Sequence, residues 1–276
     1  MEPVLTALFV PGTHGERFDT ALASGADAII IDLEDAVAPG HKQQARDTAA
    51  RWLLSSPEAA VSRTWVRLNS LGSPFFDEDA AFLGHLRHND RFPAAVILPK
   101  AEHRESIDAL GDLLPDACAL IALIESGAGV EAASSLAQHD RVSRLAFGAA
   151  DFAADTGCRM TEMSLLYARS VLVVASAAAG LEAPLDSPCF NIGDLATIEQ
   201  HGRHGCELGF GGSLCIHPFQ IAPIRTGYMP SEAERQWAER IHAAESSAGV
   251  TRVGDEMVDA PLFKRARRIM GERSEQ

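Results

Sequence analysis

The segments ALIALIE, residues 119–125, and RLAFGA, residues 144–149, decide the fold. Both are apolar almost throughout, without the alternation of a half-exposed strand. Such runs are typical of strands whose two faces are both covered, as in parallel sheets. The chain between them is long enough for a crossover helix, so the pair predicts a βαβ unit.

The same alternation of short β-like runs and longer helical patterns extends along most of the chain. Six further candidate strands are LTALFV (5–10), DAIIIDL (27–33), TWVRLN (64–69), AAVILPK (94–100), the weaker APLD (183–186) and SLCIH (213–217). The clearest helical patterns between them cover 41–54, 103–114 and 161–180. Eight strands with crossover connections predict an α/β fold, a closed (β/α)8 TIM barrel, rather than an open sheet.

The chain continues beyond the length that eight βα units need. After Pro230 come a helical pattern over 231–249, an irregular stretch over 250–261, and a basic helical pattern over 262–272. We therefore expect a barrel over 1–230 and a C-terminal helical extension over 231–276. Such an extension would cap the barrel mouth or contact another subunit.

Composition and charge indicate a globular protein with a small-molecule partner. The chain has 276 residues, of which 46% are hydrophobic, and a formal net charge of −14. That charge disfavours binding to nucleic acid or to an anionic membrane, because both attract positive surfaces. The N-terminal sequence has no signal-peptide pattern, and the five scattered cysteines are expected to be reduced, so we expect a cytoplasmic protein.

Polar residues stand at the carboxyl end of almost every candidate strand. In order along the chain they are Asp32, Glu34, Asp35, Arg67, Asn69, Lys100, Glu125, Asp151, Asp186 and His217. The carboxyl ends of barrel strands share one face, and catalytic residues of barrel enzymes gather there. Any one of these residues could be a solvated loop charge, but their coincidence predicts an active site.

Glu125 and Asp151 are the candidate metal ligands. They follow neighbouring strands and have no His or Cys companion, so they suit Mg²⁺, which prefers oxygen ligands and keeps bound waters. Arg67 offers a planar cation that can grip a carboxylate or stabilise an enolate. The pattern therefore predicts magnesium as cofactor and an anionic small molecule as substrate.

Eight short motifs carry a resemblance to a known family. They are LFVPG, DLEDAV, VRLNS, ILPK, LIES, FGAADF, GFGGSLCIHPFQI and EMVDAP, which occur in this order between residues 5 and 268. With these motifs the chain resembles the citrate lyase beta-subunit-like branch of the HpcH/HpaI aldolases.

The resemblance implies a (β/α)8 barrel, often a homotrimer or other homo-oligomer, and a Mg²⁺-dependent carbon–carbon lyase. Such enzymes act on citryl-CoA, malyl-CoA or citramalyl-CoA. It implies metal ligation by Glu125 and Asp151 and contact of Arg67 with the reacting acyl group. It further implies a substrate site with Phe9, Ala150, Asp151, Ile216 and His217, and an acid/base role for Asp259, which reaches a neighbouring subunit's site. The position of Asp259, shortly before Pro261, is also typical of a helix N-cap.

Some cations of the family pattern are missing from this chain. Relatives commonly have a basic residue at the position of His14, a lysine at that of Thr20, and a Gly-Lys pair where this chain has Gly212 and Ser213. Relatives also carry a glutamate where Ala150 stands, which predicts altered tuning of the metal site rather than its loss.

Two other functions stay open at this point. The missing cations favour an aldolase that acts on a free 2-oxo acid. The resemblance also allows an obligate subunit of a citrate lyase complex, which works on a carrier-bound acyl group. Activity of the isolated protein would separate the first possibility from the second.

Overall fold

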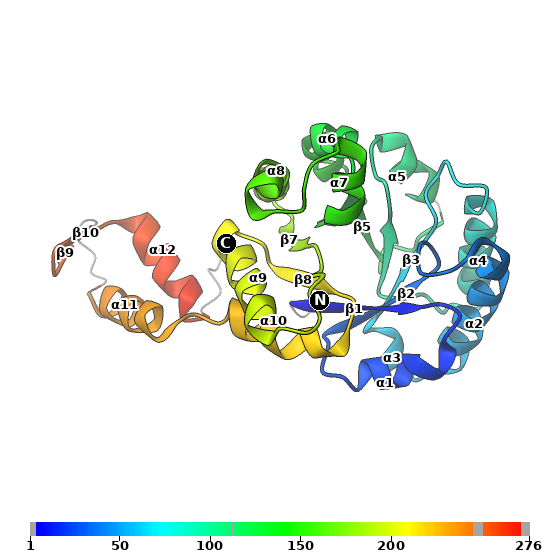
Figure 1. The fold of residues 1–276 in the computed structure, drawn as a ribbon, viewed down its shortest axis with the longest axis horizontal. Helices are drawn as coiled ribbons and strands as arrows, with labels where there is room; N and C mark the ends of the chain where they lie inside the picture. Colours follow the sequence, from blue (N-terminus) through cyan, green and yellow to red (C-terminus); the bar gives the residue numbers. More distant parts are fainter. Residues whose placement is uncertain (1–3, 112, 245–250, 272–276) are drawn as a thin grey trace. The chain divides into compact units, whose positions relative to one another are not determined.

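A computed structural model describes residues 4–111, 113–244 and 251–271. Eight parallel strands close into a barrel in sequence order, with a ring of helices around them (Figure 1). The strands are β1 (Thr6–Pro11), β2 (Ala28–Asp32), β3 (Thr64–Arg67), β4 (Ala95–Leu98), β5 (Ala119–Ile124), β6 (Val142–Phe147), β7 (Glu182–Asp186) and β8 (Gly212–Cys215). The predicted (β/α)8 barrel is confirmed, including the weak seventh strand.

Two hydrophobic layers explain why the strands are apolar on both faces. One cluster fills the barrel interior and includes Ile30, Trp65, Ile97 and Leu123. The neighbouring residues of each strand point outward, as Ile29 does, and pack beneath the helices in a second, larger cluster. Successive side chains of each strand enter one buried layer and then the other, so neither face of the strand is polar. These strands therefore lack the usual alternation of apolar and polar residues.

The helices connect successive strands and cover the outside of the barrel. They are α1 (Phe18–Leu22), α2 (Lys42–Ser55), α3 (Glu58–Val61), α4 (Phe76–His88), α5 (Arg104–Gly111), α6 (Gly127–Ala137), α7 (Ala149–Thr156), α8 (Glu162–Ala179), α9 (Leu195–Leu208) and α10 (Ile221–Tyr228). Three short 3-10 helices, η1 (Gly15–Arg17), η2 (Pro39–His41) and η3 (Pro218–Gln220), precede helices. The three helices predicted from sequence are present as α2, α5 and α8.

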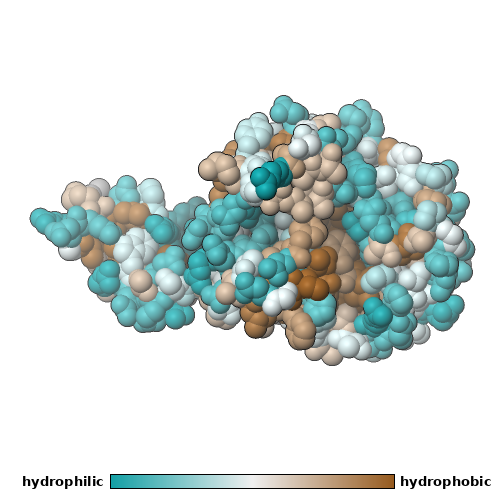
Figure 2. Space-filling view, viewed as in Figure 1, coloured by the Kyte–Doolittle hydropathy of each residue, from teal (hydrophilic) through white to brown (hydrophobic). Residues whose placement is uncertain are grey.

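The helix α8 combines length with low polarity, and by these two criteria alone it could cross a membrane. A third of it is buried in the fold (33%), and Leu165, Ala168 and Leu172 form its buried side. Core helices pass the same test of length and composition, so the finding is weak evidence for a membrane span. In the surface view, hydrophilic residues dominate the barrel unit, and hydrophobic ones gather in a central hollow (Figure 2).

The chain divides between Tyr228 and Met229 into two compact units. The C-terminal unit contains α11 (Glu232–Ala243), β9 (Thr251–Val253), β10 (Glu256–Val258) and α12 (Ala260–Ile269). The prediction of an irregular stretch over 250–261 was wrong, because β9 and β10 pair as an antiparallel hairpin around Gly254, whose φ is +61°. Part of the predicted helix over 231–249 lies outside the described residues.

Candidate active site at the carboxyl ends of the strands

A cavity of about 360 Å³ lies at the carboxyl ends of the barrel strands. It brings together eight of the residues that the sequence predicted for the site, namely Phe9, Asp32, Asp35, Arg67, Glu125, Ala150, Asp151 and Ile216. The remaining lining residues are Ala36, Leu123, Gly148, Ala149, Pro188, Phe190 and Leu214. The lining contains carboxylates, one guanidinium and apolar side chains, which suits a small anionic molecule that also carries an apolar part.

Glu125 follows β5 and lies almost fully buried, 4% exposed. The backbone N–H of Lys100 donates to its Oε1 over 2.8 Å. Gly148, at the end of β6, makes room for it, because a Cβ built there would lie 2.5 Å from Oε2 of Glu125. The glycine of FGAAD is therefore required by close packing against a carboxylate, and its neighbour Asp151 stands in the first turn of α7.

Arg67, at the end of β3, is held on three sides. Its Nε and Nη2 donate to Oδ1 and Oδ2 of Asp32 over 2.8 and 2.6 Å, and its Nη1 lies 2.9 Å from Oε2 of Glu34. The guanidinium also stacks over the Phe9 ring, 4.7 Å from its centroid. This geometry fixes the plane of the guanidinium toward the cavity before any ligand arrives.

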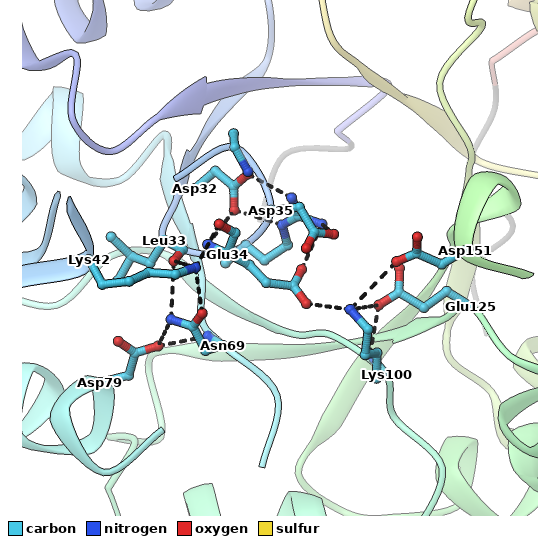
Figure 3. Close-up of polar contacts among 12 residues, drawn as sticks. Asp32, Leu33, Glu34, Asp35, Lys42, Asn69, Asp79, Lys100, Glu125 and Asp151 are labelled. Atoms are coloured by element: carbon cyan, nitrogen blue, oxygen red, sulfur yellow. Dashed lines mark hydrogen bonds and ion pairs between the residues drawn. The ribbon is translucent and has the colours of Figure 1, made fainter. Parts of the chain in front are cut away.

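Lys100 places an ammonium among three carboxylates (Figure 3). Its Nζ lies 2.6 Å from Oε1 of Glu34, 3.5 Å from Oδ2 of Asp151 and 3.9 Å from Oε1 of Glu125. The backbone of Lys100 is left-handed, with φ +50°, a conformation that costs free energy in a non-glycine residue. This backbone points both its N–H and its ammonium at the carboxylates.

The charge balance of this cluster shifts the pKa values of its members. Burial and then the charge of Glu34 raise the pKa of Glu125 to about 8. Burial raises the pKa of Glu34 as well, against the opposing charge of Arg67. Burial acts to lower the pKa of Lys100, but the hydrogen bond with Glu34 and the charges of Glu34 and Glu125 together outweigh burial and raise it. These raised pKa values show that the metal-free cluster holds protons that a bound cation would displace.

Glu125 and Asp151 could together bind a divalent cation. Both supply carboxylate oxygens, and the ammonium of Lys100 already lies close to both carboxylates. Within the described ranges, no group of three or more His, Cys, Asp or Glu is arranged to hold a metal ion. Two carboxylates without a closed protein cage suit Mg²⁺, which keeps several waters for a substrate to displace.

Other strand-end residues have structural roles. Asn69 lies in a buried network in which it donates to Asp79, and Lys42 Nζ donates to Oδ1 of Asn69 over 2.7 Å. Lys42 also donates to the backbone carbonyls of Leu33 and Glu34, both over 2.7 Å. This network fixes the turn that carries the acidic residues after β2.

Asp186 is the last residue of β7, and its described ion pairs are with Arg169 and His201 rather than with the acidic cluster. Arg169 of α8 binds both of its carboxylate oxygens and donates to Nδ1 of His204 over 2.9 Å. Arg169 and Asp186 are 3% and 1% exposed. The strand-end position of Asp186 therefore reflects a buried ion pair between β7 and α8.

Two nominated residues lie outside the cavity lining. His217 accepts a hydrogen bond at Nδ1 from the backbone N–H of Phe219 over 3.2 Å and caps η3, so its described contacts are those of a structural cap. Asp259 occupies the N-cap position of α12, although its side chain makes no capping hydrogen bond. It belongs to the C-terminal unit.

Pro188 and Phe190 line the cavity although the sequence nominated neither. They lie between β7 and α9, in a stretch without periodicity or motif, so no sequence signal marked them. The contacts of Lys100 with both candidate metal ligands were also missed, because spacing along the chain does not show which strand-end side chains meet.

Comparisons with known proteins identify the family of this chain. Residues 5–218 match the family described as HpcH/HpaI aldolase/citrate lyase. A citrate lyase subunit beta-like protein of Deinococcus radiodurans is 31% identical, over 96% of this chain and 95% of that protein. Citrate lyase subunit beta of Leuconostoc mesenteroides is 32% identical, with 96% and 91% coverage.

The solved structures include a protein with nearly full-length similarity. CitE of Mycobacterium tuberculosis, in complex with magnesium, acetoacetate and coenzyme A, superposes with a TM-score of 0.85 at 30% identity. The similarity covers 99% of each chain. The relatives thus share the full length of this chain rather than the barrel alone.

Proposed function

This chain belongs to the HpcH/HpaI aldolase/citrate lyase family, as a lyase of its citrate lyase beta-subunit-like branch, and from that premise we propose its reaction. It cleaves a 3-hydroxyacyl thioester into a 2-oxo acid and an acetyl thioester, with Mg²⁺ as cofactor. One observation carries the proposal: Glu125, Asp151 and Arg67 line a single cavity at the carboxyl ends of the strands.

Glu125 and Asp151 would hold the metal. When bound, Mg²⁺ supplies Lewis-acid stabilisation of a hydroxyl or keto oxygen. The backbone N–H of Lys100 orients Glu125, and Gly148 gives that carboxylate its space. Magnesium in the complex of the 30% identical CitE supports this assignment.

Arg67 would stabilise the enolate that cleavage produces. In the proposed step the hydroxyl loses its proton to a base and the bond between C2 and C3 breaks. The electron pair passes to the thioester as an enolate, which then takes a proton at carbon. Asp32 and Glu34 hold the Arg67 guanidinium in place, so its orientation costs little reorganisation during the reaction.

Asp259 is the proposed acid/base group, contributed by the C-terminal unit of a neighbouring copy in a homo-oligomer. Its carboxylate stands at the start of α12 without a capping hydrogen bond, so the helix does not consume its oxygens. The assignment rests on the position of Asp259 in the EMVDAP motif.

A second candidate function is aldol cleavage of a free acid without a thioester. His14 supports it, because it stands where the family resemblance implies a permanent cation, and its Nδ1 lies 2.9 Å from Oε1 of Glu16. In a third possibility the chain works within a citrate lyase complex, as the similarity to the Leuconostoc protein allows.

The test is a cleavage assay of the purified protein with Mg²⁺, on a panel of free hydroxy acids and their CoA thioesters. We expect cleavage of a thioester by the protein alone and its loss in Glu125→Ala. The exposed Glu131 of α6 offers a matched control, and Glu131→Ala should retain activity. Cleavage of free acids alone would support the aldolase, whereas no cleavage of any substrate would refute the lyase proposal for the isolated chain.

A further inference from the structure

Gln220, in the GFGGSLCIHPFQI motif, has no part in the reaction proposed above. It is the last residue of η3 and is 1% exposed. Its side chain does not line the active-site cavity. A carboxamide this deeply buried needs partners for its N–H groups and for its oxygen. The partners of Gln220 are backbone groups in two segments that form the cavity wall.

The first segment follows β8. The Oε1 atom of Gln220 accepts from the backbone N–H of Ile216 over 2.7 Å and from that of His217 over 3.2 Å. Ile216 lines the cavity. One buried oxygen thus receives two consecutive N–H groups, which fixes the path of the chain as it leaves the strand.

The second segment follows β7. The Nε2 atom of Gln220 donates to the backbone carbonyl of Cys189. Pro188 and Phe190, the two neighbours of Cys189 in the chain, line the cavity. The side chain of Phe190 is 47% exposed, so packing alone holds this segment weakly. The hydrogen bond from Gln220 therefore matters for its position.

Side chains link the two segments because the sheet ends before it reaches them. The register of β7 with β8 ends at the pair Asp186 and Ser213. Next to that pair, the hydroxyl of Ser213 donates to the backbone carbonyl of Ser187 over 3.0 Å. Gln220 then adds three hydrogen bonds at the level of the cavity lining. It replaces the strand pairing that would otherwise hold the two segments together.

From these contacts we infer that Gln220 is a positioning residue of the active site, which holds Ile216 and residues 188–190 where the substrate meets them. The inference deepens the proposed function and rests on it. Glu125 and Asp151 follow other strands, β5 and β6, and have no described contact with Gln220. Loss of Gln220 should therefore weaken substrate binding more than metal binding or the chemical step.

Hydrogen exchange followed by mass spectrometry tests the inference on the protein alone. Gln220→Met keeps the length of the side chain but removes its hydrogen bonds. We expect exchange in peptides covering 187–192 and 214–219 to be at least about tenfold faster, and exchange over 148–152 to stay unchanged. The same substitution at an exposed position of α9, Gln200→Met, is the matched control. Unchanged exchange in the first two peptides of Gln220→Met would overturn the inference.

A second variant, Gln220→Glu, separates the two segments. An ionised carboxylate still accepts from the N–H groups of Ile216 and His217, but it cannot donate to the carbonyl of Cys189. We expect faster exchange over 187–192 and unchanged exchange over 214–219. Exchange that rises in both peptides as much as in Gln220→Met would indicate a general loss of stability and would overturn the inference.

Steady-state kinetics connects the two segments with the reaction. The assay uses Mg²⁺ and the CoA thioester that the unmodified protein cleaves. We expect Gln220→Met to raise KM about tenfold and to change kcat less than about threefold. The affinity for Mg²⁺, measured by calorimetry, should stay unchanged. Leu86→Ala, in the outer core at α4, is the stability control, because it should lower Tm without changing KM.

The two measurements distinguish failure of the inference from failure of the proposed function. An unchanged KM in Gln220→Met would overturn the inference and leave the lyase function intact. If the unmodified protein cleaves no thioester, the proposed function fails, and the exchange measurement still decides whether Gln220 holds the two segments.

Discussion

Two ion-pair clusters stand at the carboxyl ends of the strands, and they differ in burial and in charge balance. The β7 cluster consists of Arg169, Asp186 and His204, in which one guanidinium binds one carboxylate. The mouth cluster consists of Asp32, Glu34, Arg67, Lys100, Glu125 and Asp151, in which four carboxylates face two cations. The balanced cluster ties α8 to β7, whereas the unbalanced one, once its four carboxylates are ionised, has two negative charges in excess, which a divalent cation would neutralise.

The largest expected effect concerns the stability of the β7 cluster. Asp186→Asn leaves the Arg169 guanidinium buried without its counter-charge and should cost about 3–5 kcal/mol of unfolding free energy. Glu199→Gln, in an ion pair of α9 whose partners Arg203 and Glu199 are 40% and 39% exposed, should cost under about 1 kcal/mol. Urea unfolding curves of the two variants make the comparison, and similar midpoints would show that the β7 cluster is not structural.

Arg67→Lys, in the mouth cluster, should reduce activity rather than stability. Lysine keeps the charge but loses the paired contact with Asp32 and the contact with Glu34. We expect kcat to fall on the order of 100-fold, the magnitude of one lost oxyanion stabiliser, with little change in Tm.

Steady-state kinetics and thermal unfolding of the same preparation measure both quantities. Arg51→Lys, at an exposed position of α2, is the matched control and should leave both unchanged. A loss of Tm in Arg67→Lys that is as large as that in Asp186→Asn would remove the distinction between the clusters.

The pH dependence of stability and of Mg²⁺ affinity should distinguish the mouth cluster from the β7 cluster. Burial raises the pKa of Glu125 to about 8, so between pH 4.5 and 8 the metal-free folded protein keeps a proton that the unfolded chain releases. Stability without metal should therefore fall as the pH rises through this window. Mg²⁺ requires the carboxylate, so its affinity should rise about tenfold per pH unit up to about pH 8.

Thermal unfolding with a chelator and calorimetric Mg²⁺ titrations between pH 6 and 8.5 would record both trends. In Glu125→Gln the trend in stability should flatten, with Glu34 contributing what remains. A Mg²⁺ affinity that does not change with pH would contradict the protonation of Glu125.

The smallest effect is expected at Lys100. Its ammonium lies within 3.9 Å of both candidate metal ligands, so it competes with an incoming cation. Lys100→Met should tighten Mg²⁺ binding about tenfold, a modest factor because the side chain is partly exposed. Calorimetric titration measures the change, and Lys264→Met, exposed in the C-terminal unit, is the control. Weaker binding in Lys100→Met would mean that the lysine assists the metal instead.

The sequence allowed prediction of the barrel and of the residues at its strand ends. Glu125, Asp151 and Arg67 could be nominated because strand-end positions share one face in any parallel barrel. The division of the strand-end residues into two clusters could not be predicted, because Asp186 and Glu125 are both carboxylates at the end of a strand. Only the packing of α8 shows that Asp186 meets Arg169.

The conformation of the loops could not be predicted from the sequence either. The left-handed backbone of Lys100 has no residue signature, since glycine and asparagine are the usual residues there. The short hairpin of β9 and β10 was read as irregular because three-residue strands are too short to show alternation. His217 was nominated for the substrate site, whereas Nδ1 of its imidazole faces the backbone of η3.

The most direct test of the metal site is a Mn²⁺ titration followed by electron paramagnetic resonance, with Mg²⁺ as competitor. We expect one Mn²⁺ per chain, displaced by Mg²⁺, with binding lost in both Glu125→Gln and Asp151→Asn and retained in Glu131→Gln. Binding of Mn²⁺ by Glu125→Gln with the affinity of the unmodified protein would contradict the assignment of the mouth cluster as the metal site.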